Sequence, residues 1–309
     1  MILLKKEKIK IVDSYKFSEM MGESLHHITA KLVDHCRLSY RDLALQEREK
    51  LISSCIEKLF NDKQKIAAPE RERVWYEGWK ENHDLLIKSD DIANAILPKF
   101  IRESEIIRID GRFCYSENKQ FEKYFLDCLL SFLYYNFCDE HDEIHEFGTG
   151  SGYNIFKFSQ EDDKKNYYGY DFVQSSVDCL NGLHKKTGIS FTGFKYDFLK
   201  PKEVRFGNNA VAFTFGALEQ TGGNFQDFIN ILAHSNVKKV FHIEPTVENY
   251  FNDTIEDTLA RIFHLKRGYS TGLKDYLISN PNISFKYCRR IGFGNKMMEG
   301  YNLYLWEPR

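Results

Sequence analysis

A short apolar strand, three alternating glycines and the start of a helix follow one another at residues 143–152. The strand contains Glu146, and the glycines are Gly148, Gly150 and Gly152. Glycines at a strand-to-helix turn let the backbone approach a ligand that a side chain would block. The free N–H groups of the helix start favour an anionic ligand group, while Glu146 adds negative charge to the same pocket. We therefore expect a ligand that carries both a carboxylate and a cationic centre.

From about residue 142 onward, strands alternate with helices. Strands are expected at 143–147, 166–171, 189–195, 209–215 and 237–243. This alternation predicts an α/β fold with a mostly parallel sheet and helices on both faces. The last two strands, 283–293 and 299–306, are too close in sequence to be parallel neighbours, so we expect an antiparallel hairpin. We predict two domains, a mainly helical lid and substrate region at 1–141 and a ligand-binding domain at 142–309.

Composition excludes several classes of protein. The 309-residue chain has a formal net charge of −2, which gives no general attraction to nucleic acids or membrane surfaces. No apolar run approaches the roughly 18–20 residues that span a bilayer, and the amino terminus lacks the pattern of a signal peptide. Seven cysteines without close pairing indicate a reducing compartment. We expect a cytoplasmic location and no membrane partner, and the sequence sets no oligomeric state.

The glycine turn and the acidic residues that follow the next two strands together resemble the class I S-adenosylmethionine (SAM) dependent methyltransferases. The resemblance covers about residues 115–309 and implies a Rossmann-like, seven-stranded fold with SAM as cofactor. It implies that the glycine turn faces the methionine part of SAM and that Asp171 takes the ribose hydroxyls. It also implies that Asp197 faces the adenine amino group, with Phe198 beside the ring. The expected cofactor-binding residues are Tyr115, Glu146, Gly148, Gly150, Gly152, Asp171, Phe172, Asp197, Phe198 and Phe215.

The glycine pattern has two other interpretations. A dinucleotide site has glycines at the first, third and sixth positions, whereas Tyr153 occupies the sixth position here. The second is a glycine-rich turn that binds nothing. The acidic residues Asp171 and Asp197 and the terminal hairpin make this second interpretation the weaker one.

Three side chains at the ends of the fourth and fifth strands are candidates for proton transfer: Glu219, His242 and Glu244. His242 and Glu244 point to the same side of their strand because side chains alternate. Such a pair can take a proton from a hydroxyl or an amine, and it can equally be a satisfied buried pair. The alternative for Glu219 is a capping carboxylate. We expect no metal site, because three such ligands are too few to argue for one.

The end of the fourth strand also bears on the acceptor. Residues 213–220 lack the Asn/Asp-Pro-Pro-aromatic motif that many family members acting on nucleic acid bases or glutamine side chains carry. A looser resemblance, at 216–221, 242–245, 267–269 and 299–308, is to a bacterial subgroup associated with surface polysaccharides. We therefore expect O- or N-methylation of a small molecule, such as a sugar or sugar nucleotide, and no nucleic acid partner. The alternatives are a methyltransferase for RNA or protein and a non-catalytic SAM-binding protein.

The amino-terminal part offers weaker signals. Residues 17–37 and 40–61 read as two helices, and 105–115 as a hairpin that turns at Asp110-Gly111. Aromatic side chains at 75, 76 and 79 and arginines at 102, 108 and 112 can grip a sugar and a phosphate. The stronger alternative is that Trp75 and Trp79, one helical turn apart, belong to the core.

Overall fold

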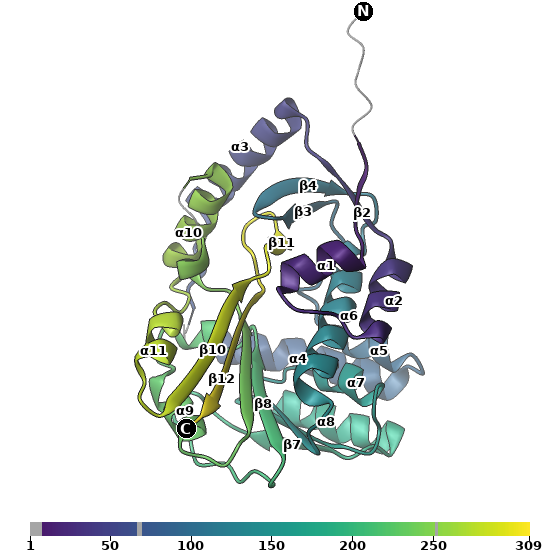
Figure 1. Ribbon diagram of the computed structural model, residues 1–309, viewed down its shortest axis with the longest axis vertical. Coiled ribbons are helices and arrows are strands. Elements are labelled where there is room, and N and C mark those ends of the chain that lie inside the picture. Colours follow the sequence, from purple (N-terminus) through teal and green to yellow (C-terminus); the bar gives the residue numbers. More distant parts are fainter. Residues whose placement is uncertain (1–7, 67–69, 251–252) are drawn as a thin grey trace, which may run out of the picture.

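The computed structural model describes residues 8–66, 70–250 and 253–309 (Figure 1). Its larger sheet has seven strands in the order β10-β12-β9-β8-β5-β6-β7. The parallel strands are β5 (Glu143–Phe147), β6 (Asn166–Asp171), β7 (Phe191–Lys195), β8 (Ala210–Phe215) and β9 (Lys239–Glu244). The strands β10 (Ile283–Arg290) and β12 (Asn302–Pro308) pair antiparallel, and β12 is also antiparallel to β9. The predicted fold class, including the terminal hairpin, is confirmed.

Helices cover both faces of this sheet, as expected for buried parallel strands. One face packs against α6 (Phe121–Leu133), α7 (Tyr153–Ser159) and α8 (Gln174–Thr187). The other packs against α9 (Gln226–Ala233) and α11 (Leu273–Ser279). A π-helical turn, η1 (Tyr134–Cys138), ends α6, and the 3-10 turns η2 (Leu218–Thr221) and η3 (Val247–Asn249) follow β8 and β9. Because η2 and η3 directly follow parallel strands, they lie at the carboxyl edge of the sheet, where ligands bind in open α/β folds.

The amino-terminal region, which is predicted to be mainly helical, also contributes strands to a second sheet. Its order is β1-β2-β4-β3-β11, with β1 at Lys10–Val12, β2 at Leu38–Asp42, β3 at Ile106–Ile109, β4 at Arg112–Ser116 and β11 at Phe293–Asn295. Because β11 comes from the carboxyl-terminal part, this sheet crosses the predicted domain boundary at 141/142. The predicted hairpin is confirmed, and Asp110 and Gly111 both adopt the positive φ that such a tight turn needs.

The first two helices also differ from prediction. Residues 17–37 form two helices, α1 (Ser14–Met21) and α2 (His27–Cys36), because Gly22 ends the first in the left-handed conformation. The predicted helix at 40–61 begins later, as α3 (Leu45–Asn61), since β2 occupies the preceding residues. At the other end of the chain, α10 (Ile255–Arg267) packs against α3.

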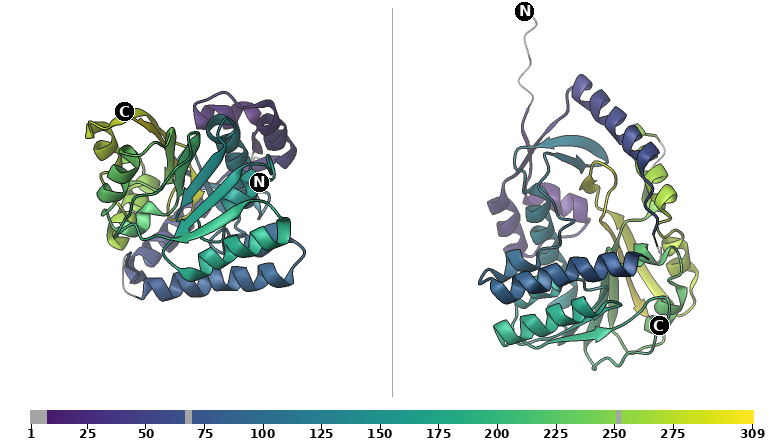
Figure 2. Two further views of the ribbon diagram at one scale, coloured as in Figure 1. Left: turned by 90° about the horizontal axis from the view of Figure 1, so that it is seen from below. Right: turned by 180° about the vertical axis from the view of Figure 1, so that it is seen from behind.

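A long helix, α4 (Arg71–Lys88), and the short α5 (Ile92–Ile96) lie over the carboxyl edge of the large sheet. Figure 2 shows α4 beside α8 in both views. The amide of Asn82 in α4 donates to the carbonyl of Ala95 at 2.8 Å, and Ser151 of the glycine turn donates to the carbonyl of Ile96 at 2.5 Å. The predicted lid is thus fixed directly to the glycine turn. In the described part of the chain, no helix has both the length and the apolar character needed to cross a membrane.

Candidate active site

The glycine turn is fixed to the neighbouring strand by its backbone. The N–H groups of Gly148 and Thr149 donate to the carbonyl of Tyr170 in β6, at 2.7 and 3.1 Å. Gly148 has a φ of 78°, and a Cβ there would lie 2.2 Å from the Cβ of Ala217. Both the conformation and the close approach of the loop after β8 therefore require glycine at this position.

Glu146 stabilises the glycine turn through hydrogen bonds of its side chain. It is 0% exposed, and its carboxylate accepts from the Thr149 hydroxyl at 2.9 Å and the Asn154 amide at 2.7 Å. Burial raises the pKa of Glu146 to about 8. These contacts hold the turn against the start of α7, while direct binding of a ligand by Glu146 stays a prediction.

Asp171 meets the same turn from the end of β6. Its Oδ2 accepts from the Gly150 N–H at 2.9 Å, and its Oδ1 accepts from the Val173 N–H at 3.2 Å. The residue is 5% exposed, and burial raises its pKa to about 6. The structure therefore brings together two features that are 21 residues apart in the sequence.

The other predicted cofactor residues lie at the same edge of the sheet. Asp197 follows β7 and accepts from the Leu199 N–H at 2.9 Å, which fixes its loop. The Phe198 ring approaches the glycine turn, since a Cβ on Gly148 would lie 3.5 Å from its Cε2. Phe172, directly after Asp171, and Phe215, at the end of β8, are both half-buried. Their contacts with a ligand stay predictions.

Tyr115 does not belong to this group, which corrects its prediction as a cofactor residue. It lies in β4 of the smaller sheet, paired with β2 and β3. Its ring lies against the Arg41 guanidinium, 4.5 Å from ring centroid to Cζ, and its hydroxyl bonds to Glu105. The sequence places Tyr115 shortly before α6 but gives no sign that the strand turns it toward Arg41.

Trp79 of α4 covers the glycine turn. A Cβ on Gly150 would lie 2.7 Å from its Cζ2, and the residue is only 8% exposed. Trp75 stacks on Trp79, with ring centroids 5.5 Å apart and planes 20° apart. Trp79 therefore combines the two interpretations left open for these aromatic residues, because it is buried like a core residue and lies on the predicted ligand site.

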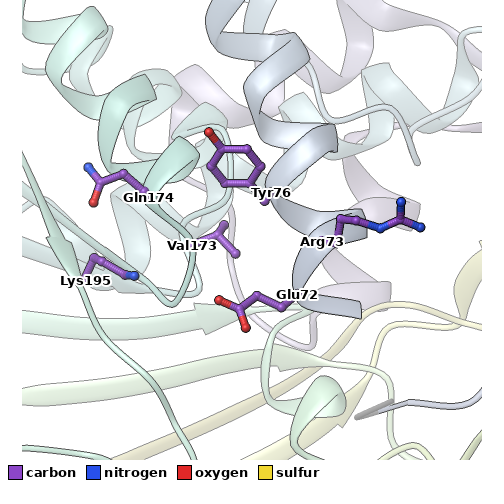
Figure 3. Close-up of a pocket in the computed structure, with 6 residues that line it drawn as sticks. All are labelled: Glu72, Arg73, Tyr76, Val173, Gln174 and Lys195. Atoms are coloured by element: carbon purple, nitrogen blue, oxygen red, sulfur yellow. The ribbon is translucent and has the colours of Figure 1, made fainter. Parts of the chain in front are cut away.

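A cavity of about 460 Å³ lies beside Trp79's helix at the ends of β6 and β7 (Figure 3). Its lining residues come from α4, the start of α8 and the end of β7: Glu72, Arg73, Tyr76, Val173, Gln174 and Lys195. Val173 and Gln174 come shortly after Asp171 in the chain, so the cavity lies next to the predicted nucleoside end. Except for Tyr76, which belongs to the aromatic cluster, sequence reasoning missed these residues. Exposed polar positions on a helix carry no signal that they face a ligand.

His242 is a satisfied buried histidine, which corrects its prediction as a proton acceptor. Its Nε2 accepts from the Trp306 indole N–H at 2.9 Å. Its Nδ1 lies 2.8 Å from the Thr214 hydroxyl and donates to it, because Nε2 is already the acceptor. Burial lowers its pKa to about 3, so the ring is neutral with neither nitrogen free.

The Glu244 carboxylate is occupied by hydrogen bonds from backbone N–H groups, which corrects its prediction as the proton-transfer group. Its Oε1 accepts from the N–H groups of Ala217 and Leu218, both at 3.1 Å, and its Oε2 accepts from the Glu219 N–H at 3.3 Å. Burial raises its pKa to about 7, while these hydrogen bonds and one from Thr214 oppose the rise. Glu244 therefore anchors the turn η2, on the same side of β9 as His242, as predicted.

Glu219 is different from both. Its Oε1 accepts from the Gln220 amide at 2.8 Å, whereas its Oε2 is buried and bonds to no other group within the described residues. Burial and the charge of Glu244 raise its pKa to about 8, while Arg71 and Arg267 lower it. Glu219 is therefore the one of the three predicted catalytic residues that keeps an oxygen for an acceptor.

The arginines of the hairpin are not available as a group for a phosphate. Arg108 is fully buried, and its guanidinium donates to the carbonyls of Glu256, Asn295 and Lys296 at 3.0 to 3.2 Å. It joins α10 and β11 to the hairpin and has a structural role.

No family model and no curated protein matches the chain. Solved structures that are similar include the rRNA methylase from Escherichia coli, at 14% identity and a TM-score of 0.45, covering 85% of this chain and 92% of that one. The plantazolicin methyltransferase BpumL, in complex with SAH, is 11% identical with a TM-score of 0.42, covering 85% and 98%. The [4+2]-cyclase SpnF is 13% identical with a TM-score of 0.48, covering 74% and 78%.

Likeness at this level concerns the fold alone, and the three proteins differ in the activities that they are named for. The strand order, with β12 inserted antiparallel between β9 and β10, is that of the Rossmann-like methyltransferase fold.

Proposed function

We propose that this protein is a SAM-dependent methyltransferase that methylates an oxygen or nitrogen atom of a small molecule. The observation that carries this proposal is the 2.9 Å contact between the Asp171 carboxylate and the Gly150 N–H. It joins the glycine turn and the acidic end of β6 into one site, as the sequence resemblance requires.

The residues of this site fit SAM. Both oxygens of Asp171 accept from backbone N–H groups, and the Phe172 N–H also bonds to this carboxylate. When SAM is bound, its ribose hydroxyls would donate to the same acceptor-only group. The glycine turn has no side chain at Gly148 and Gly150, and the cavity is lined by Val173 and Gln174, which follow Asp171 closely in the chain. When bound, SAM supplies an electrophilic methyl group on its positively charged sulfur. Trp79 and α4 shield the turn from water, which strengthens electrostatic contacts there.

We call the region around Glu219, Gln220 and Arg71 the acceptor half of the site, and the region around the glycine turn and Asp171 the cofactor half. In the acceptor half, the residues of this chain would hold the acceptor molecule in place and take up its proton. Alignment of the acceptor atom with the methyl group provides most of the acceleration in such a displacement. A base is needed when the acceptor is a hydroxyl or a protonated amine. The unpaired Oε2 of Glu219 suits this role, because a pKa raised to about 8 lets the carboxylate hold a proton near neutral pH.

Among small molecules, we propose a sugar or sugar nucleotide as the acceptor. The half-buried Trp75 ring provides an apolar wall, and the Arg71 Cζ lies 4.9 Å from its centroid, which places a cation for a phosphate beside it. Thermal shifts of the SAH-loaded protein against a panel of nucleotide sugars test this class. We expect stabilisation by a subset, and no shift with any member would contradict it.

The activity itself is tested by transfer of a labelled methyl group from SAM into a cell extract that has been separated into small-molecule, RNA and protein fractions. We expect label in the small-molecule fraction and a large loss with Glu219→Gln. Label confined to RNA or protein would support the alternative enzyme. SAM binding without any transfer would indicate a non-catalytic SAM-binding protein.

A further inference from the structure

Two hydrogen bonds join Glu219 to the first residue of the lid helix. The Gln220 amide donates to Glu219 Oε1 at 2.8 Å, and the Arg71 Nη2 donates to Gln220 Oε1 at 3.4 Å. An amide donates only from its nitrogen and accepts only at its oxygen. The guanidinium at the oxygen end of Gln220 therefore fixes which end of the amide faces Glu219.

The backbone beneath Glu219 is held separately. Glu244 accepts from its N–H, and the Ser270 hydroxyl donates to the carbonyl of Leu218 at 2.7 Å. With η2 fixed in this way, the position of the Glu219 carboxylate depends on what its side chain contacts. Among the described residues, Gln220 donates the hydrogen bond to its Oε1 and leaves Oε2 without a partner.

Arg71 is itself positioned for this contact. Its guanidinium lies over the Trp75 ring, one turn further along α4, and its Nε is buried with no hydrogen-bond partner in the described part of the chain. Trp75 in turn stacks on Trp79, which lies on Gly150. One helix therefore contacts both the glycine turn, through Trp79, and the turn η2, through Arg71.

We propose that Arg71 is a positioning residue that acts through Gln220 to hold the Glu219 carboxylate with Oε2 free for the acceptor. The inference rests on the proposed role of Glu219 as proton acceptor. It means that the proton acceptor is complete only while the amino-terminal end of α4 is docked on η2. The two unpaired buried atoms, Nε of Arg71 and Oε2 of Glu219, then suit an acceptor that presents an oxygen to the first and a hydroxyl or amine to the second.

The charges around Glu219 determine how the proposal is tested. Burial and Glu244 raise the pKa of Glu219, while Gln220, Arg71 and Arg267 lower it. Tyr269 also lies close enough for the charge of Glu219 to raise the tyrosine pKa. Removal of the Arg71 charge or of the Gln220 amide should each raise the pKa of Glu219 further. If Arg71 acts through Gln220, the two effects should not add in a double mutant, whereas independent effects of charge and amide would add.

The experiment is a pH titration of the full-length protein with ¹³Cδ-labelled glutamate, followed by NMR. The Glu219 signal is assigned as the one that disappears in Glu219→Gln. We expect its midpoint to rise in Arg71→Met and to return toward the wild-type value in Arg71→Lys, which restores a cation. Gln220→Leu, which leaves α4 intact, should raise it as well and serves if Arg71→Met does not fold. Lys80→Met is the matched control, because Lys80 is an α4 cation paired with Asp84 and should leave the midpoint unchanged.

Unchanged midpoints in both Arg71→Met and Gln220→Leu, or a double-mutant shift equal to the sum of the two single shifts, would overturn the inference. In methyl transfer, the acidic limb of the pH–rate profile should move to higher pH in Arg71→Met, in step with the titration.

The inference about Arg71 and the proposed function can be contradicted separately. If the wild type binds SAM without transferring label while the titration still responds, the coupling stands and the activity is wrong. If label is transferred but neither the titration nor the profile moves, only the role of Arg71 is wrong.

Discussion

The two halves of the crevice are built differently. In the cofactor half, both oxygens of Glu146 and both oxygens of Asp171 accept hydrogen bonds from the glycine turn or from residues close to it. In the acceptor half, Glu219 and Arg71 each keep a buried polar atom that is unpaired within the described residues. Carboxylates that are already paired are positioned before the ligand arrives. Unpaired buried groups, which also include the Ser175 hydroxyl at the start of α8, need a ligand to complete their hydrogen bonds, because such groups are costly to leave unsatisfied.

Glu219 and Glu244 show the same contrast between two acids that are joined by one hydrogen bond. Glu244 accepts from three consecutive backbone N–H groups, so its position is set by the fold. Glu219 projects from the turn that Glu244 holds, and one of its oxygens is unengaged. The difference supports the proposal that Glu244 holds the turn while Glu219 takes part in the reaction.

The largest expected effect is on turnover. Glu219→Gln should lower methyl transfer by about 100-fold or more, because an amide cannot take the acceptor's proton. The affinity for SAM should stay at the wild-type value, since Glu219 lies in the other half. Single-turnover transfer of labelled methyl groups and calorimetry with SAM measure the two quantities. Equal rates in the mutant and the wild type would remove Glu219 from the reaction.

A smaller effect is expected in the cofactor half. Asp171→Ala should weaken SAM binding by about 1–3 kcal/mol, or roughly 5- to 150-fold, because partners for the ribose hydroxyls and for Gly150 are lost. Asp197→Ala is the matched comparison, since Asp197 is half-buried and accepts from its own loop. Asp197→Ala should weaken SAM binding less than Asp171→Ala does. Unchanged calorimetric affinity in Asp171→Ala would contradict the assignment of this half.

The contrast between the two acids predicts opposite phenotypes. Glu244→Gln should lower the free energy of unfolding by about 1–3 kcal/mol, because an amide nitrogen would face backbone N–H donors. For Glu219→Gln, the free energy of unfolding at neutral pH should lie within about 0.5 kcal/mol of the wild-type value or above it. Only the hydrogen bond with Gln220 changes in this mutant. Urea unfolding of the two mutants checks this order. A larger loss in Glu219→Gln would reverse the roles proposed for the two residues.

The last prediction concerns the pH dependence of stability. Folding raises the pKa of Glu219 from 4.5 to about 8, so between these values the folded state binds more protons than the unfolded state. The free energy of unfolding should therefore fall as pH rises through this window. Glu219→Gln removes this contribution, so its stability should decline less steeply than that of the wild type. Parallel slopes in urea titrations at pH 5 to 8 would show that Glu219 is not the shifted group.

Sequence reasoning predicted the cofactor half better than the acceptor half, for physical reasons. Strand alternation and the glycine turn are local patterns, and they placed Asp171 correctly at the end of β6. What Glu244 and His242 contact depends on the packing of distant segments, such as the indole of Trp306 on β12. Sequence spacing does not encode these contacts. Likewise, β11 joined the smaller sheet from a segment that looked like a glycine-rich link.

The lid shows both outcomes. A helical region over the crevice was expected, and the Trp75–Trp79 pair marked the right helix. That Trp79 covers Gly150, and that Arg71 reaches Gln220, depends on how α4 lies across the strand ends. Amphipathic spacing predicts a helix and its buried side, but it does not indicate which partner that side meets.

A crystal structure of the protein with S-adenosylhomocysteine tests the account most directly. We predict that the ribose hydroxyls bind Asp171 and that the amino-acid end lies against the turn at residues 148–150, with α4 closed over it. A structure that shows this turn still covered only by Trp79, with the ligand bound elsewhere or a pyrophosphate preferred in its place, would contradict it.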